Sequence, residues 1–338
     1  MRIYKLVTIK EVSELAQVSQ ATVSRAINGH SSVQKKNKLK VLAAIKELGY
    51  KPNAVAQALA SNRSNSIGML VGSLDGPYYG PLMHNVESTI RKHNLHFVVT
   101  SGLESQDRET NSINFLQSKR VDGLVIHADQ LSDDELIQVV KETPATIILN
   151  RYVPELALQC ITINNELGGY IATKHLLENG HTRVACITGQ MSKIDSRDRL
   201  QGYRNAITEF GLKYDPDLII EGRFDHQGNA EVIDRLFERK NGMTAVFCQN
   251  DHIALKVYDA CNERNLKVGE DISIVGFDNH SYCQYINPKL TTMNLPIVEM
   301  GNEAAIGLLA LLKKKPHSLK TNLTPELICR DSVKNLNE

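Results

Sequence analysis

The sequence lacks the features that mark several large classes of protein. Its longest apolar run, Ala304–Leu312, is far shorter than the roughly 20 residues that cross a bilayer, and its first residues hold no apolar segment of a secretory signal. The six cysteines are scattered, with neither a C-x-x-C pair nor the spacing of metal ligands. These absences predict a soluble cytoplasmic protein without a metal site, in which the cysteines are small buried residues.

Motifs of the common enzyme classes are also missing. The chain contains no G-x-G-x-x-G, G-x-x-x-x-G-K-[ST], H-E-x-x-H or G-x-S-x-G pattern. Asp195, Asp198 and Asp278 could supply an acid–base pair, but Arg197 and Arg199 beside the first two favour ionised, non-catalytic carboxylates. We therefore expect no catalytic residue and no cofactor.

The charge is divided unevenly along the chain. Residues 1–63 hold 11 Lys and Arg against 3 acidic residues, a net charge of +8, whereas the remainder holds 28 against 35, a net charge of −7. A basic head on a mildly acidic body predicts that the head alone binds nucleic acid. A length of 338 residues predicts two or three domains.

Two short helical patterns joined by a tight turn occupy residues 7–28. Thr8 and Glu11 form a T-x-x-E capping box. The first helix has its apolar residues at helical spacing, at Ile9, Val12, Leu15 and Ala16. Ser19 is a favourable N-cap for the second helix, whose apolar face is formed by Val23, Ala26 and Ile27.

The other positions of the second helix suit contacts with DNA. Their side chains can reach base edges and phosphate oxygens: Gln20, Ala21, Thr22, Ser24, Arg25 and Asn28. The pattern therefore predicts a helix-turn-helix, which places the N-terminal residues of its second helix in the major groove. An ordinary helical hairpin has the same spacing. A third helix is expected at 38–48, with Leu39, Leu42, Ile45 and Leu48 closing the small core.

A family resemblance favours DNA binding over the plain hairpin. VTIKEVSELAQVSQATVSRAIN at 7–28 is followed by LGYKPN at 48–53 and AVAQALA at 54–60. These motifs, in this order, resemble the LacI/GalR family of bacterial transcription regulators, and the resemblance continues to the end of the chain. Within the family it is strongest to the galactose repressor and isorepressor group, through GLVIHADQLSDDEL at 123–136, IILNRYVPEL at 147–156 and RLQGY at 199–203. Gln17 departs from the family, which usually has glycine in this turn, where a positive φ strains other residues.

The resemblance implies three parts: a DNA-binding head at 1–52, a hinge helix at 53–62 and an effector-binding and dimerisation body at 63–338. It implies DNA contacts from Thr8, Ser19 and the second-helix residues named above, and from the hinge residues Asn53, Val55, Ala56 and Leu59. Leu59 matches the leucine with which the family unstacks a base step and kinks the minor groove. A plain linker helix with Leu59 in a core is the alternative.

Beyond residue 66 the pattern predicts an α/β body with two parallel sheets. Short apolar strands alternate with helical segments, which is typical of βαβ units. The expected strands are 67–73, 96–101, 122–127 and 146–150, and then 183–188, 217–222, 244–249 and 273–278. The two series imply two lobes, and the resemblance implies a periplasmic-binding-protein fold. By that resemblance lobe 1 comprises about 63–162 and 295–325, and lobe 2 about 163–294 and 326–338.

Polar and aromatic residues that follow the strands are candidates for holding a ligand, because ligands bind at the carboxyl ends of parallel strands. The candidate effector-binding residues are Tyr78, Asn150, Arg197, Arg199, Phe224, Asn250 and Asp278. Polar groups among them can bind adjacent sugar hydroxyls, and Phe224 or Tyr78 can cover the apolar face of a sugar ring. Asp251 is expected to cap the helix that follows it.

We therefore expect a homodimeric repressor of sugar-utilisation genes in the bacterial cytoplasm, associated with the nucleoid. It would bind near-palindromic double-stranded operator DNA and be released by a small sugar, such as a galactose-like hexose or a β-glucoside. A purine or other metabolite acting as co-repressor is the alternative within the family. A sugar-handling enzyme or a periplasmic transport receptor could share the α/β body, but the basic head and the missing motifs and signal argue against both.

Overall fold

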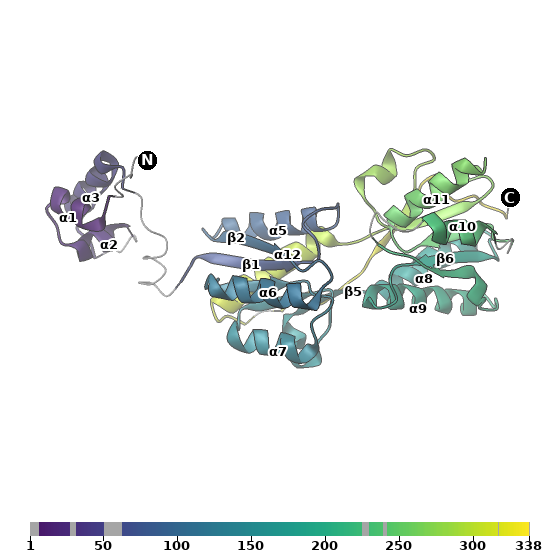
Figure 1. The fold of residues 1–338 in the computed structure, drawn as a ribbon, viewed down its shortest axis with the longest axis horizontal. Coiled ribbons are helices and arrows are strands. Elements are labelled where there is room, and N and C mark those ends of the chain that lie inside the picture. Colours follow the sequence, from purple (N-terminus) through teal and green to yellow (C-terminus); the bar gives the residue numbers. More distant parts are fainter. Residues whose placement is uncertain are drawn as a thin grey trace. The chain divides into compact units, whose positions relative to one another are not determined.

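The computed structural model describes residues 7–27, 32–50, 63–224, 230–238, 242–316 and 318–337. The chain forms two compact units, a head that ends at Asn65 and a body that begins at Ser66 (Figure 1). The expected hinge helix at 53–62 lies outside the described residues, and so do Asn28, Asn53, Val55, Ala56 and Leu59. None of the helices in the described part of the chain is both long and apolar enough to cross a membrane.

The head contains the three expected helices, α1 (Ile9–Ala16), α2 (Gln20–Ile27) and α3 (Lys35–Leu48). The Thr8 capping box is confirmed: the Glu11 carboxylate accepts the Thr8 N–H at 2.7 Å, and Thr8 Oγ1 accepts the Glu11 N–H at 3.4 Å. Ser19 Oγ accepts the Thr22 N–H at 3.1 Å and so caps α2 as predicted. The helices enclose a core whose buried members are Val12, Ala16, Val23, Ala26, Val41 and Ala44.

Three leucines predicted to lie in this core are exposed instead. Leu15, Leu39 and Leu42 retain 43%, 61% and 47% of their surface. The helix α3 begins three residues earlier than predicted, and its inner face runs through Val41 and Ala44, which at the helical period turns Leu39 and Leu42 outward. Small side chains there let three short helices approach closely.

Gln17 keeps the tight turn without a glycine. Its backbone adopts φ 52° and ψ 47°, the left-handed conformation that commonly ends a helix. The Gln17 N–H donates to the Glu14 carbonyl and the Val18 N–H to the Ser13 carbonyl, so the last carbonyls of α1 are satisfied. The turn therefore forms here at the cost of a strained non-glycine residue.

The first sheet of the body has the strand order β11-β5-β4-β3-β1-β2, and all its pairings are parallel. Its strands are β1 (Ser66–Val71), β2 (His96–Ser101), β3 (Gly123–Ile126), β4 (Thr146–Leu149), β5 (Cys160–Ile163) and β11 (Asn322–Leu323). The helices of this lobe are α5 (Tyr79–Arg91), α6 (Gln106–Ser118), α7 (Asp133–Glu142) and α12 (Ile297–Leu312) (Figure 1). Both faces of β3 and β4 are buried, which explains why these strands appear in the sequence as unbroken apolar runs.

The second sheet has the order β12-β10-β9-β8-β6-β7, parallel except for the antiparallel pair β10–β12. Its strands are β6 (Val184–Thr188), β7 (Ile219–Glu221), β8 (Ala245–Cys248), β9 (Ser273–Asp278), β10 (Thr291–Asn294) and β12 (Glu326–Ile328). The helices of this lobe are α8 (Asn165–Glu178), α9 (Ile194–Glu209), α10 (Ala230–Glu238) and α11 (Asp251–Glu263). The chain moves from the first sheet to the second after β5, returns after β10, and crosses again between β11 and β12.

Candidate functional site

A cavity of about 410 Å³ lies between the carboxyl ends of the two sheets. Five of the seven residues predicted to bind an effector line it: Tyr78, Arg199, Phe224, Asn250 and Asp278. A cavity of this size suits a small molecule. Because the carboxyl ends of both sheets face it, residues from both lobes can hold one ligand.

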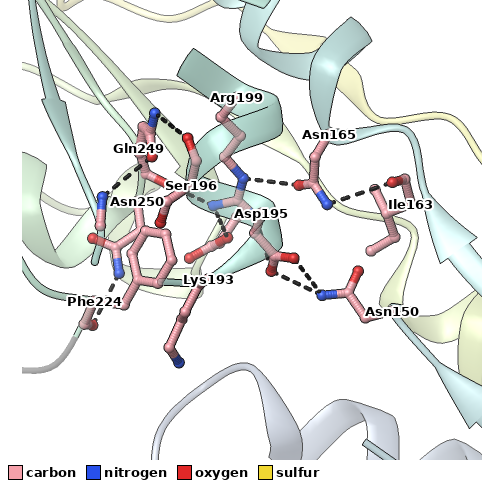
Figure 2. A network of polar contacts seen from close by, with 12 residues as sticks. Asn150, Ile163, Asn165, Lys193, Asp195, Ser196, Arg199, Phe224, Gln249 and Asn250 are labelled. Atoms are coloured by element: carbon pink, nitrogen blue, oxygen red, sulfur yellow. Dashed lines mark hydrogen bonds and ion pairs between the residues drawn. The ribbon is translucent and has the colours of Figure 1, made fainter. Parts of the chain in front are cut away.

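Arg199, a lining residue of the cavity, lies at the centre of a polar network (Figure 2). Only 4% of its surface is exposed. Its Nε donates to Asn165 Oδ1 at 2.8 Å and its Nη1 to the Gln249 carbonyl at 2.6 Å. Its guanidinium also lies 3.9 Å from Asp278 Oδ1 and 3.9 Å from the centre of the Phe277 ring. Arg199 therefore organises the floor of the site besides facing its interior.

Close packing of α8 on α9 positions this arginine. A β-carbon on Gly169 would lie 2.1 Å from the Arg199 carbonyl oxygen, and one on Gly202 would lie 2.0 Å from the Glu166 carbonyl oxygen. The backbones of the two helices therefore approach so closely that only glycine fits at either crossing. The helix α9 begins at Ile194, so Asp195 and Arg199 lie one turn apart on one helix.

Phe224 offers a flat apolar surface at the cavity. Its ring lies over Gly189, where a β-carbon would fall 2.4 Å from Phe224 Cζ. Asn250 holds the backbone nearby, because its Nδ2 donates to the Phe224 carbonyl at 3.0 Å while its Oδ1 accepts the Ile253 N–H at 2.8 Å. Asn250 is thus the cap of α11, a role that we expected of Asp251.

Asp251 instead lies fully buried behind the cavity. Its carboxylate accepts hydrogen bonds from Thr292 Oγ1 at 2.6 Å, the His280 N–H at 2.8 Å and Cys283 Sγ at 3.1 Å. Burial, together with the nearby charge of Asp278, raises the pKa of Asp251 to about 6. Burial opposes the charge on His280, but the Asp278 carboxylate at 3.4 Å, through its hydrogen bond and its charge, and the charge of Asp251 together outweigh burial and raise the pKa of His280.

Tyr78 presents a hydroxyl group that lacks a partner. The oxygen is buried, and it makes no hydrogen bond within the described part of the chain. Burial, with the nearby charges of Asp195 and Asp278, raises the pKa of Tyr78 well above its usual value, so the group stays a neutral O–H donor. An unsatisfied buried hydroxyl costs roughly 1–3 kcal/mol, which a ligand oxygen in the cavity could recover.

Polar contacts join the two lobes across the cleft. Lys193, before α9, lies 2.6 Å from Glu104 Oε1 after β2 and 3.1 Å from Asp129 Oδ2 after β3. Asn150, after β4, donates to both carboxylate oxygens of Asp195 at 2.8 Å each. These contacts hold the lobes together beside the cavity.

Two predicted effector-binding residues lie outside the cavity lining. Asn150 forms the bridge to Asp195 just described, and its backbone has a φ of 57°. Arg197 is exposed and donates to the carbonyls of Met191 and Ser192 at 2.9 and 2.7 Å. Being two residues from Arg199 on a helix, it points away from the face that Arg199 presents to the cleft.

Sequence reasoning missed several polar residues that line the cavity, among them His127, Asp129, Lys193, His252 and His280. The signal for His127 and Asp129 was present, because they follow β3 just as Tyr78 follows β1. His280 lies two residues after Asp278, which we did identify. Lys193 and His252 lie at the starts of helices α9 and α11, at the same edge of the sheet.

The helix α2 presents its predicted DNA-contact residues as a separate surface on the head. Gln20, Ala21 and Arg25 are exposed, and Thr22 and Ser24 are partly exposed, while Val23 and Ala26 are buried. The capping residues Thr8 and Ser19 are also exposed, with their side-chain oxygens engaged in the caps of α1 and α2.

Family models match two regions of the chain. Residues 8–53 match the model described as bacterial regulatory proteins, lacI family. Residues 173–333 match the model of a periplasmic binding protein-like domain.

Curated relatives and solved structures extend the similarity to nearly the whole chain. The HTH-type transcriptional repressor PurR of Aliivibrio salmonicida is 36% identical over 98% of this chain and 100% of its own length. The HTH-type transcriptional regulator GalR of Escherichia coli is 35% identical over 97% of this chain and 96% of its own. The crystal structure of the Lac repressor dimer bound to operator and the anti-inducer ONPF is 29% identical, with a TM-score of 0.86 over 98% of this chain and 100% of that one.

Proposed function

The chain belongs to the LacI family and is a DNA-binding transcription repressor rather than an enzyme, and from this premise we propose that a small neutral sugar controls its binding to operator DNA. In this proposal the head of residues 1–52 binds one half of a near-palindromic operator and the hinge at 53–62 contacts its centre. Two copies of the chain act together as a homodimer in the bacterial cytoplasm, at the nucleoid. The similarity to the Lac repressor dimer supports this assembly.

The charge balance of the cavity is the observation that carries the sugar proposal. Two of its three Lys and Arg side chains face carboxylates, Lys193 within 3.1 Å of Glu104 and Asp129, and Arg199 within 4.0 Å of Asp195 and Asp278; the third, Arg223, is exposed at the cavity. A phosphate or carboxylate ligand would have to displace these pairs, because such ligands bind most strongly to charge-assisted donors. A neutral polyhydroxyl compound can use the same groups as donors and acceptors without displacing them.

The remaining lining groups suit a sugar ring. Phe224 provides an apolar face for its C–H groups, and the unpartnered Tyr78 hydroxyl provides a donor. Asp278 and Asp195 provide acceptors for adjacent hydroxyls. A galactose-like hexose or a β-glucoside is the specific ligand that we propose. A purine is the second candidate, because the same Phe224 face would stack on a flat base.

The mechanism follows from the two-lobed arrangement. A sugar that contacts both lobes favours their closed arrangement, and the body passes that change to the paired heads and weakens their hold on DNA. Because the coupling is a thermodynamic linkage, operator DNA must weaken sugar binding by the same factor. In the head, Gln20 and Ala21 are proposed to contact base edges and Arg25 a base or a phosphate.

Calorimetric titration of the full-length chain with galactose, glucose, a β-glucoside and a purine tests the proposal. We expect one hexose or glucoside to bind, and we expect Phe224→Ala to abolish that binding while Arg197→Ala retains it. Binding of the purine alone would refute the sugar assignment and indicate a co-repressor. Equal ligand affinity in the Phe224→Ala variant would show that the cavity is not the binding site.

DNA binding is tested separately by fluorescence anisotropy on duplex DNA selected from a random pool. Arg25→Ala should cost about 1–3 kcal/mol of affinity for the selected sequence, while ligand binding in the cavity is unchanged. If Arg25→Ala binds the selected DNA as wild type does, α2 is not the recognition helix.

A further inference from the structure

The edge of the first sheet at which its strands begin carries a group of exposed basic residues. The strand register aligns Ser66 with His96, Ile67 with Gly123, and Leu124 with Thr146, so β1 to β4 begin together. The helices α5, α6 and α7 return from the carboxyl ends of the strands and end at this edge. The helix α12 ends there too, since its Leu308 packs on Gly123 at the start of β3.

The residues at and just after these four helix ends are mostly basic. We call the following eight residues the basic edge: Arg91, Lys92, Lys119, Arg120, Lys141, Lys313, Lys314 and Lys315. All eight are exposed. Three carboxylates lie close to these basic residues in the chain, Glu87, Asp122 and Glu142, and Glu87 pairs with Arg91. The edge therefore has an excess of positive charge on a body that is negative overall.

The second lobe shows that helix ends in this fold need not be basic. Its helices α8, α9, α10 and α11 all end on a glutamate, at Glu178, Glu209, Glu238 and Glu263. Two arginines at that edge are held in ion pairs, Arg183 with Asp215 and Arg264 with Asp234, while Lys213 and Lys267 are exposed there. The favourable interaction of a cation with a helix C-terminus applies equally to both lobes, so it does not explain the difference between them.

The basic edge surrounds the point at which the chain arrives from the DNA-binding head. Ser66 begins β1, a strand in the interior of the sheet between β3 and β2, flanked by α5 and α6 (Figure 1). The chain between Tyr50 and Ser66 spans at most about 55 Å even when fully extended. DNA held by the head is therefore kept at a high local concentration near this surface.

We infer that the basic edge is a second DNA-binding surface, which contacts phosphates of the duplex beside the sequence read by the head. This inference rests on the proposed function, because it assumes that the head brings DNA to the body. Contacts with phosphates carry no sequence information, but they add affinity that falls steeply with salt.

The test compares two full-length variants with the same number of neutralised lysines. In the first, Lys92, Lys119, Lys314 and Lys315 are replaced by Gln. In the matched control, four exposed lysines of the second lobe are replaced by Gln: Lys213, Lys256, Lys267 and Lys289. The binding of each to random-sequence duplex DNA is measured by anisotropy over a range of KCl concentrations, with thermal unfolding as the check of folding.

We expect the first variant to bind duplex DNA roughly tenfold more weakly than wild type at low salt. Its plot of log K against log salt should also be less steep, by about 2 to 4, because each phosphate contact contributes about 0.9 to the steepness. The control should keep the wild-type slope. Equal slopes for the two variants, with Arg25→Ala still weakening binding, would overturn this inference and leave the proposed function standing. Failure of the wild-type chain to bind duplex DNA at all would overturn both.

Discussion

Replacing Arg199 by Ala should destabilise the body far more than an ordinary change at a ligand site. The guanidinium is buried, donates to Asn165 and to the Gln249 carbonyl, and lies within 4.0 Å of Asp195 and Asp278. Its removal leaves two acceptors without this donor and takes a buried cation from beside two partly buried carboxylates, which keep only His280 and Asn150 as the partners described above. Breaking a buried ion pair by removing one partner costs about 3–5 kcal/mol. For a body of this size that lowers the melting temperature by roughly 10 °C.

Arg197 provides the matched control, because it lies two residues away on the same helix. Its guanidinium is exposed and bonds only to loop carbonyls, so Arg197→Ala should cost no more than about 1 kcal/mol. The assay is thermal and urea unfolding of the full-length variants, followed through the transition of the body. If both variants unfold within about 0.5 kcal/mol of each other, the network in Figure 2 does not stabilise the body and the reasoning fails. Because Arg199→Ala is expected to be less stable, its response to sugar is measured at temperatures where the variant is folded.

Three further outcomes follow from the geometry of the cavity. Gly189→Ala should displace the Phe224 ring, because the new β-carbon would fall 2.4 Å from it; calorimetry should show weakened ligand binding, and unchanged affinity would mean that the ring is not part of the site. Lys193→Gln should loosen the contact between the lobes, seen as a larger radius of gyration by small-angle X-ray scattering; an unchanged radius would show that its two ion pairs do not hold the cleft. The pKa of Asp251 is raised to about 6, so the folded state holds this proton more tightly than the unfolded state, and His280 shifts in the same direction. By urea unfolding, the stability of wild type relative to Asp251→Asn should therefore fall as pH rises from about 4 to about 7; a difference that stays constant or rises over that interval would contradict the assignment.

Eight of the twelve strands in the described residues could be predicted, because burial leaves a direct mark on the sequence, whereas β5, β10, β11 and β12 were not predicted. Strands such as β3 and β8 are buried on both faces and form unbroken apolar runs. The start of α9 at Ile194 has no sequence signal, because residues 194–198 hold a single apolar residue and therefore form no apolar stripe. The α3 leucines were misplaced because the core of the head selects small residues, and helical spacing alone does not distinguish Val41 from Leu42.

Part of the site was predictable because ligands bind at the carboxyl ends of parallel strands. Tyr78, Phe224 and Asp278 follow strands at the carboxyl edge, and the structure places all three at the cavity. Pairing between lobes was not predictable, because Asn150 and Asp195 come from different series of strands and nothing in the sequence relates them. For the same reason Arg197 and Arg199 look equivalent in the sequence, although only one faces inward.

The three crossings between the sheets determine when each part of the protein can fold during synthesis. The head is a contiguous unit, so it can fold as soon as its residues have left the ribosome. The first lobe cannot, because α12 covers its sheet and β11 extends it, and both are made from residues beyond 296. Until then the apolar face that α12 will cover is exposed to solvent and to other nascent chains, which is the condition under which aggregation competes with folding. A ribosome that stalls before residue 296 is translated would therefore carry a folded DNA-binding head on an incomplete body. The chain thus acquires the capacity to bind DNA before it acquires the capacity to be regulated.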